Sequence, residues 1–240
     1  AYKRIVDFVH SQRQCKIGIQ LGHAGRKAEI YNPQTNELEY LSKGLIVGPS
    51  AIPYQAPPPK QPFWNSILNI QQWIDPPEYN PIVPREMTLQ EIQTFIENFA
   101  QAAERAVKAG FDTIEIHAAH GYLLHQFYSP ISNKRTDKYG GSFENRIRLL
   151  CDIVTAVRKV IPQNMPLMVR ISSEDWVPAA NESSQPPGWS LADSVKLASI
   201  LKSLGVDLID CSAGGISSLE KFKGWGLYMT SFAQELKSKA

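Results

Sequence analysis

Residues 88–122 have the sequence TLQEIQTFIENFAQAAERAVKAGFDTIEIHAAHGY, and this stretch decides the fold class. It opens with a capping box from Thr88 to Glu91, in which two side chains satisfy free backbone donors of a helix start. Apolar residues then follow at helical spacing until Gly110, the residue type that most often ends a helix. From Asp112 to His117 polar and apolar residues alternate, which is typical of a strand. The stretch therefore predicts a helix joined to a strand by one short turn.

The same alternation of strand and helix continues on both sides of this stretch. Connections of this length join parallel strands through right-handed βαβ units that cover the sheet with helices. We therefore expect an α/β fold. The further elements predicted are a helix that begins near residue 2, a buried strand over 16–21, a helix over 143–161, a strand over 166–171, a helix over 190–204 and a strand over 206–211.

Two long segments show neither period. Residues 22–87 hold ten of the 17 prolines between Pro49 and Pro84. Proline fixes φ and lacks a backbone donor, so no regular helix or central strand is expected there. Residues 118–141 are predicted to form a polar loop. The polar stretch from Ser129 to Arg146 overlaps this loop and follows the histidine-bearing strand closely enough to shape access to a site.

Two architectures accommodate alternating strands and helices. An open doubly wound sheet would place a G-x-G-x-x-G turn after its first strand, and the run from Gly22 to Arg26 lacks that spacing. A TIM-type β/α barrel places its chemistry where strands end. The ends of successive predicted strands do carry polar residues here, which favours the barrel: Gln20, His117, Arg170 and Ser212.

Composition limits the partners. The chain has 240 residues, 43% of them hydrophobic, and 25 Lys and Arg against 23 Asp and Glu. A net charge of +2 gives no basic surface for nucleic acid or an anionic membrane. No apolar run reaches the roughly 18 residues of a membrane helix. We expect a cytoplasmic protein with a small-molecule partner, in which Cys15, Cys151 and Cys211 are reduced core thiols.

The densest group of chemical side chains is the run from His117 to Tyr122. Three of the five histidines lie within nine residues here, at His117, His120 and His125. Two imidazoles at this spacing can donate hydrogen bonds to one oxygen, and the Tyr122 phenol can deliver a proton beside them. A zinc site is a weaker alternative because no H-E-x-x-H or paired Cys is present. A purely structural set of histidines is the other alternative.

Arg170 and Gln20 are candidate binding residues at two other strand ends. Arg170 ends an apolar strand, where a guanidinium needs an anion or an acceptor-rich ring. The alternative for Arg170 is an ion pair with a carboxylate, for which Glu115, Glu174 and Asp175 are the candidates. Gln20 offers donors and an acceptor that suit the pyrimidine edge of a flavin, and its alternative is to cap loop backbone.

Together these residues resemble the old yellow enzyme family of FMN-dependent oxidoreductases. The segments that carry the resemblance are 20–26, 114–124, 127–148 and 169–172. The resemblance implies that Gln20 and Arg170 bind FMN, that His117 and His120 hold an α,β-unsaturated carbonyl or nitro substrate, and that Tyr122 protonates its α-carbon. NAD(P)H would reduce the flavin first, in a ping-pong cycle, and nothing in the resemblance excludes a homo-oligomer.

The resemblance also implies an incomplete barrel. Only four strands are predicted, and they correspond to the third through sixth of the family's eight. We expect residues 1–240 to form a single, partial FMN-binding barrel domain that contains 22–87 as a long Pro-rich insertion and binds FMN poorly alone. Two alternatives stay open. One is a truncated, non-catalytic remnant of such an enzyme that acts, if at all, through association. The other is a larger relative with an iron–sulfur domain that reduces dienoyl thioesters or oxidises amines.

Overall fold

A computed structural model describes residues 1–12, 15–28, 30–32, 37–39, 46–54, 82–177, 187–221 and 228–240. Four strands form the main sheet: β1 (Gly18–Leu21), β6 (Thr113–Ala118), β7 (Leu167–Ser172) and β8 (Leu208–Ser212). The helices are α1 (Tyr2–Ser11), α3 (Leu89–Ala109), α4 (Leu123–Tyr128), α5 (Phe143–Val160), α6 (Leu191–Ser203) and α7 (Tyr228–Lys239). The remaining elements are short: a 3₁₀ turn (Gly25–Lys27), β2 (Ile30–Asn32), β3 (Glu37–Glu39), β4 (Val47–Gly48) and β5 (Arg85–Glu86).

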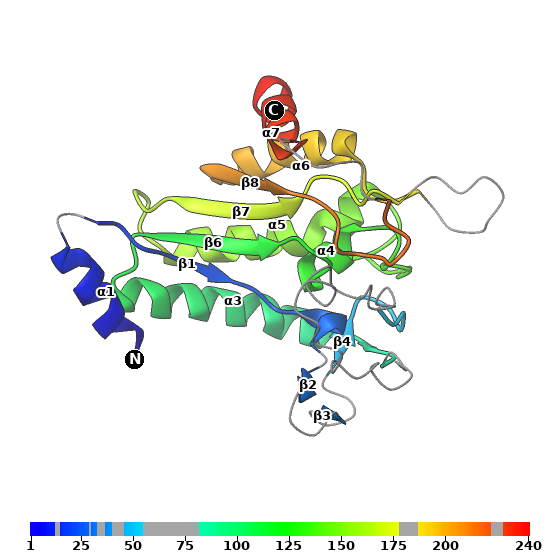
Figure 1. Ribbon diagram of the computed structural model, residues 1–240, viewed down its shortest axis with the longest axis horizontal. Coiled ribbons are helices and arrows are strands. Elements are labelled where there is room, and N and C mark those ends of the chain that lie inside the picture. The colour runs from blue at the N-terminus through cyan, green and yellow to red at the C-terminus, as the bar shows by residue number, and fades with distance from the viewer. Residues whose placement is uncertain are drawn as a thin grey trace, which may run out of the picture.

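The four strands are parallel and lie in the order β1-β6-β7-β8, side by side in Figure 1. Their register places His117 of β6 level with Arg170 of β7 and Asp210 of β8. Gln20 of β1 is level with Glu115, which precedes His117 on the same side of β6. Because the strands are parallel, their carboxyl ends lie at one edge of the sheet.

The two faces of the sheet differ in burial. One face packs on helices, and its side chains from β6 and β7 are fully buried, among them Ile116 and Val169. Side chains of α3 and α5 complete this core, and Figure 1 shows both helices running along the sheet. The opposite face is more open: Gln20 is exposed, and Leu208 is 50% exposed. The sheet is therefore buried on one side only within the described residues.

The predicted start and end of α3 are confirmed. Thr88 is the N-cap and accepts a hydrogen bond from Glu91 N–H at 3.2 Å, while the Glu91 carboxylate accepts from Thr88 N–H at 2.8 Å. Gly110 ends the helix with a φ of 92°, in the left-handed region. These contacts explain why the sequence signal was strong at both ends.

Three sequence predictions need correction, and one helix is missing from them. The polar loop predicted over 118–141 contains the short helix α4, whose six residues are all buried. The helix α7 was not predicted. The strand over 16–21 exists as β1, but it lies at an edge of the sheet and is half-exposed rather than buried. Cys15 is exposed, so it is not a core thiol.

The Pro-rich segment is partly described. Its described residues hold only a 3₁₀ turn and strands of two or three residues, in agreement with the prediction. The Pro57-Pro58-Pro59 run lies outside the described residues. In the part of the chain that the structure describes, none of the helices combines the length and hydropathy needed to cross a bilayer.

Two leucines test the assignment of the faces. Leu167 is fully buried on the helix side of the sheet, whereas Leu208 is 50% exposed on the other side. In this 240-residue chain, Leu167→Ala should lower the free energy of unfolding by about 2–5 kcal/mol. Leu208→Ala should lower it by less than about 1 kcal/mol, since it leaves no cavity. Urea denaturation measures both, and equal losses would contradict the open face.

Candidate active site

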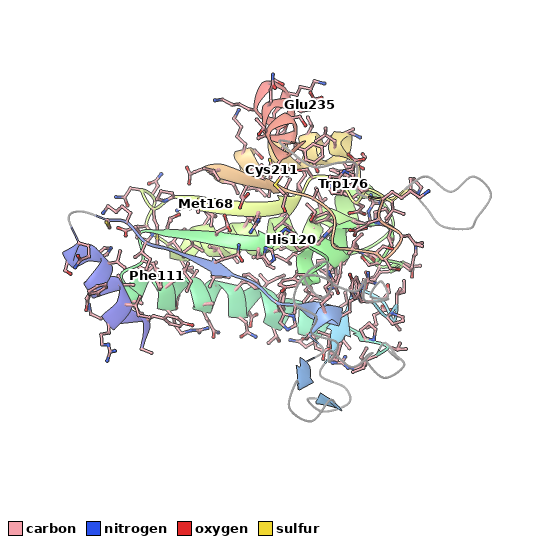
Figure 2. The ribbon with its side chains drawn as sticks, in the orientation of Figure 1. Phe111, His120, Met168, Trp176, Cys211 and Glu235 are labelled. Atoms are coloured by element: carbon pink, nitrogen blue, oxygen red, sulfur yellow. The ribbon has the colours of Figure 1, made fainter. Side chains whose placement is uncertain are left out.

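The structure gathers four of the five predicted site residues at the carboxyl edge of the sheet. His117 lies near the end of β6, and Arg170 is level with it on β7. His120 and Tyr122 follow in the turn between β6 and α4, and Figure 2 shows His120 at this end of the sheet. Gln20 lies on the same face but further from the edge, because its level matches Glu115 and not His117.

The turn that carries His120 is strained and fully paired. His120 has a φ of 58° and Gly121 a φ of 70°, so two consecutive residues are left-handed. Left-handed backbone in a residue with a side chain costs about 1–3 kcal/mol and persists only where neighbours hold it. Side chains bind every polar backbone group of this pair: His120 N–H with Ser172 Oγ (2.9 Å), His120 O with Lys27 Nζ (2.8 Å), Gly121 N–H with His125 Nδ1 (2.8 Å) and Gly121 O with Gln126 Nε2 (2.7 Å).

The two histidines and the tyrosine face one another. The ring centroids of His117 and His120 are 5.2 Å apart, and the Tyr122 ring lies edge-on to His117 at 4.8 Å. His120 Nε2 lies 2.5 Å from the Oγ atom of Ser212, and Ser212 is the last residue of β8. His117 is 5% exposed, and its Nδ1 is buried without a hydrogen-bond partner among the described residues. A buried unpaired nitrogen is costly, so His117 Nδ1 is a candidate atom for binding a ligand.

Burial and neighbouring cations keep both imidazoles neutral. Burial lowers the pKa of His117 to about 4, with smaller contributions from His120 and Arg170. Burial also lowers the pKa of His120 to about 4, with Arg170 next in importance, although Asp210 acts in the opposite direction. Neutral imidazoles at pH 7 can donate hydrogen bonds to an oxygen that gains negative charge, and they keep their own protons.

Arg170 and Gln20 each have a carboxylate neighbour. Arg170 Nε lies 3.2 Å from Asp210 Oδ2, so the ion pair considered for Arg170 exists with a different partner from the three carboxylates proposed. This pair is not aligned as a hydrogen bond, and Arg170 Nε is otherwise unpaired. The Gln20 amide donates to Glu115 Oε1 at 2.5 Å, so within the described residues Gln20 contacts a side chain and caps no loop backbone.

Sequence reasoning missed Lys27, whose side chain binds the backbone of the turn that carries His120. Its ammonium group donates to the backbone oxygens of His120 and Gly215 and lies 4.3 Å from the centre of the Tyr54 ring. Burial lowers the pKa of Lys27 to about 8, although Glu220 opposes the shift. The position of Lys27 directly after the 20–26 motif was the available signal.

Metal binding has no support in the described part of the chain. No group of three or more His, Cys, Asp or Glu side chains is placed there to hold a metal ion. His125, the third histidine of the cluster, is fully buried and turned to Asp175 at 2.7 Å instead of toward His117. Asp175 therefore pairs with His125, and the ion pair considered between Asp175 and Arg170 is wrong.

Comparisons with known proteins identify what this chain is similar to. The model of the NADH:flavin oxidoreductase / NADH oxidase family matches residues 1–236. An NADH:flavin oxidoreductase from Gibberella zeae is 44% identical over 98% of this chain and 54% of its own length. The NADPH dehydrogenase of Bacillus subtilis is 40% identical over 94% of this chain and 53% of its own length. The chain thus spans about half the length of these relatives.

Solved structures agree with these matches. Morphinone reductase is 25% identical, with a TM-score of 0.69 over 99% of this chain and 56% of its own. An Old Yellow Enzyme from Pichia sp. AKU4542 is 30% identical, with a TM-score of 0.59 over 85% of this chain and 47% of its own. The four strands and their helices therefore match about half of each larger enzyme.

The lowered pKa values of the two histidines predict sensitivity to acid. Both pKa values lie below that of an unfolded histidine, near 6.5, so protonation favours unfolding. The stability that depends on neutral imidazoles is complete above pH 6.5 and is lost as the pH falls toward about 4. In the double variant H117N/H120N, the free energy of unfolding measured by urea denaturation should fall less steeply with pH over this range. The same pH dependence as in the wild type would contradict lowered pKa values at His117 and His120.

Proposed function

Since this chain belongs to the NADH:flavin oxidoreductase / NADH oxidase family, we propose that it carries the substrate-binding half of an FMN-dependent oxidoreductase. The reaction is reduction of the C=C bond of α,β-unsaturated carbonyl or nitro compounds, with NAD(P)H as the reductant in a ping-pong hydride transfer. The observation that carries this proposal is the group of His117, His120 and Tyr122, with its unpaired buried His117 Nδ1.

The polar groups at the carboxyl edge fit FMN. His117 Nδ1 and Arg170 Nε are both buried with no hydrogen-bond partner among the described residues, so the edge has polar atoms to offer a ligand. Arg170 supplies a positive charge beside a ring system that becomes anionic when reduced. Gln20 has the donor and acceptor atoms for a pyrimidine edge, once its amide leaves Glu115. The open face near Gln20 leads us to expect weak binding of FMN by this chain.

The residues of this chain then have distinct tasks. Bound FMN supplies the hydride. His117 and His120 donate hydrogen bonds to the carbonyl or nitro oxygen, which draws electron density from the C=C bond and stabilises the charge that develops. Because both imidazoles stay neutral at pH 7, they polarise this oxygen without transferring a proton to it. Tyr122, whose ring lies against His117, delivers the proton to the α-carbon.

The open face of the sheet favours a second candidate function. Gln20 and Leu208 are exposed on this face, and β1 and β8 are the edge strands of the sheet within the described residues. Unpaired strand edges are sites where another chain can pair. In this alternative the chain is a non-catalytic protein that retains the histidine cluster and acts through another polypeptide. Catalytic turnover separates the two candidates.

Tyr122 gives the sharpest test of the proposed reaction. Tyr122→Phe keeps the ring against His117 and removes only the proton donor. We expect the purified chain, assayed with excess FMN, NADPH and 2-cyclohexenone, to reduce the enone. Tyr122→Phe should lower kcat for enone reduction by about 100-fold or more, the range of general acid catalysis. The rate of flavin reduction by NADPH should not change, because this step needs no proton from Tyr122.

Tyr2→Phe is the matched control. Tyr2 is 62% exposed on α1, so its hydroxyl should affect neither rate. Lack of NADPH-dependent enone reduction by the wild-type chain in excess FMN would contradict the proposal and favour the second candidate. An equal loss of both rates in Tyr122→Phe would show that Tyr122 is not the proton donor.

A further inference from the structure

A buried histidine–carboxylate pair lies directly behind the turn that carries His120. His125 and Asp175 are both fully buried, and His125 Nε2 is 2.7 Å from Asp175 Oδ1. The other oxygen of Asp175 accepts hydrogen bonds from Ser129 Oγ and from Trp189 N–H, both at 2.7 Å. The carboxylate is therefore fully satisfied, as a buried charge must be.

The hydrogen bonds fix the tautomer of His125. A backbone N–H can only donate, so His125 Nδ1, which lies 2.8 Å from Gly121 N, must be the acceptor. The ring proton is then on Nε2 and points to Asp175. An imidazole that donates to a buried carboxylate becomes a better acceptor at its other nitrogen, by the same logic that orients metal-bound histidines. His125 thus links Asp175 to the backbone of Gly121.

Strained backbone lies at both ends of this link. Only two residues other than glycine have positive φ in the described residues: His120, at 58°, and Trp176, at 54°. His120 precedes Gly121, which binds His125, and Trp176 follows Asp175. Figure 2 shows both on the side of the carboxyl edge. Strain of about 1–3 kcal/mol per residue persists only where surrounding contacts over-determine it, and it clusters at functional sites.

Close packing against the loop after β8 also restricts the His120–Gly121 turn. A Cβ atom on Gly121 would lie 1.8 Å from Gly215 O, so the backbone of the turn is pressed against the loop after β8. The same backbone conformation carries the His120 ring to Ser212 and to within 5.2 Å of His117. A change of φ at His120 or Gly121 would move the ring away from both.

We propose that His125 is a positioning residue, which holds the His120–Gly121 turn in its left-handed conformation through Gly121 N–H and is itself held by Asp175. The orientation of the His120 ring follows from this contact. That the oriented ring then binds substrate rests on the proposed function. The inference therefore assigns the buried pair to the site, although neither side chain touches the site itself.

The hydrogen bond can be measured directly in the folded wild-type chain. With ¹⁵N-labelled protein, NMR should show His125 as the Nε2–H tautomer and should detect a scalar coupling between Gly121 ¹⁵N and His125 Nδ1. The opposite tautomer, or a coupled partner other than His125, would overturn the proposal. This measurement needs no variant, so it holds even if substitutions at His125 prevent folding.

Two substitutions separate the two hydrogen bonds of the His125 ring. His125→Gln keeps a donor near Asp175 but removes the acceptor of Gly121 N–H. His125→Asn keeps an acceptor near Gly121 but loses the contact with Asp175. We expect His125→Gln to raise the pKa of His120 by one unit or more, toward 6.5, as the ring becomes exposed, and His125→Asn to raise it less. Folded His125→Gln with an unchanged His120 titration would overturn the proposal.

Ser129→Ala is the matched control. It removes another hydrogen bond to Asp175, equal in length to that of His125, and leaves the contact with Gly121 intact. The free energy of unfolding of the Ser129→Ala variant should fall, while the pKa of His120 stays at the wild-type value. A shift in Ser129→Ala as large as that in His125→Gln would mean that loss of stability alone moves His120, which contradicts a specific role for His125.

Kinetics separate this inference from the proposed function. With excess FMN, His125→Gln should raise KM for 2-cyclohexenone by about tenfold, while flavin reduction by NADPH keeps its rate. If the wild-type chain shows no turnover but the NMR results hold, the positioning role stands and the proposed function fails. If turnover occurs and His125→Gln leaves both KM and the His120 titration unchanged, the positioning role fails and the proposed function stands.

Discussion

The site depends on the register of four parallel strands. Pairing of β6 with β7, and of β7 with β8, sets His117, Arg170 and Asp210 at one level, near the edge where all four strands end. A shift by one residue would turn His117 into the core among the α3 and α5 side chains and expose Ile116 instead. The apolar residues of the helix-covered face prevent this shift, because their burial is worth about 25 cal/mol per Å². The hydrophobic core thus determines which side chains reach the site.

A second layer of contacts positions the histidines within this frame. The β6–α4 turn is strained at His120, and side chains from the 3₁₀ turn, β7 and α4 bind its backbone. Burial and the Arg170 charge keep the imidazoles neutral. The same low-dielectric surroundings that strengthen a hydrogen bond to a buried atom make an unpaired one, such as His117 Nδ1, costly.

The sequence predicted the α/β alternation, the bounds of α3 and the grouping of His117, His120 and Tyr122, because these depend on local periodicity, capping and spacing. The incomplete β/α barrel and the resemblance to the old yellow enzyme family are confirmed. The helix α4 was missed because six buried residues are too few to show a helical period. The Arg170–Asp210 pair and the Lys27 contact join distant segments, so no local pattern contains them. The roles of Gln20, Arg170, His117, His120 and Tyr122 stay predictions.

The proposed reaction requires FMN to bind at the carboxyl edge, beside His117 and Arg170. The most direct measurement is a titration of the ¹⁵N-labelled chain with FMN, followed by NMR at the ring nitrogens of His117 and at Arg170 Nε. Both should shift in proportion to bound FMN, while His10, which pairs with Asp112 at the amino edge of the sheet, should not. Absence of any shift at His117 and Arg170 at millimolar FMN, or an equal shift at His10, would show that FMN does not bind at this edge.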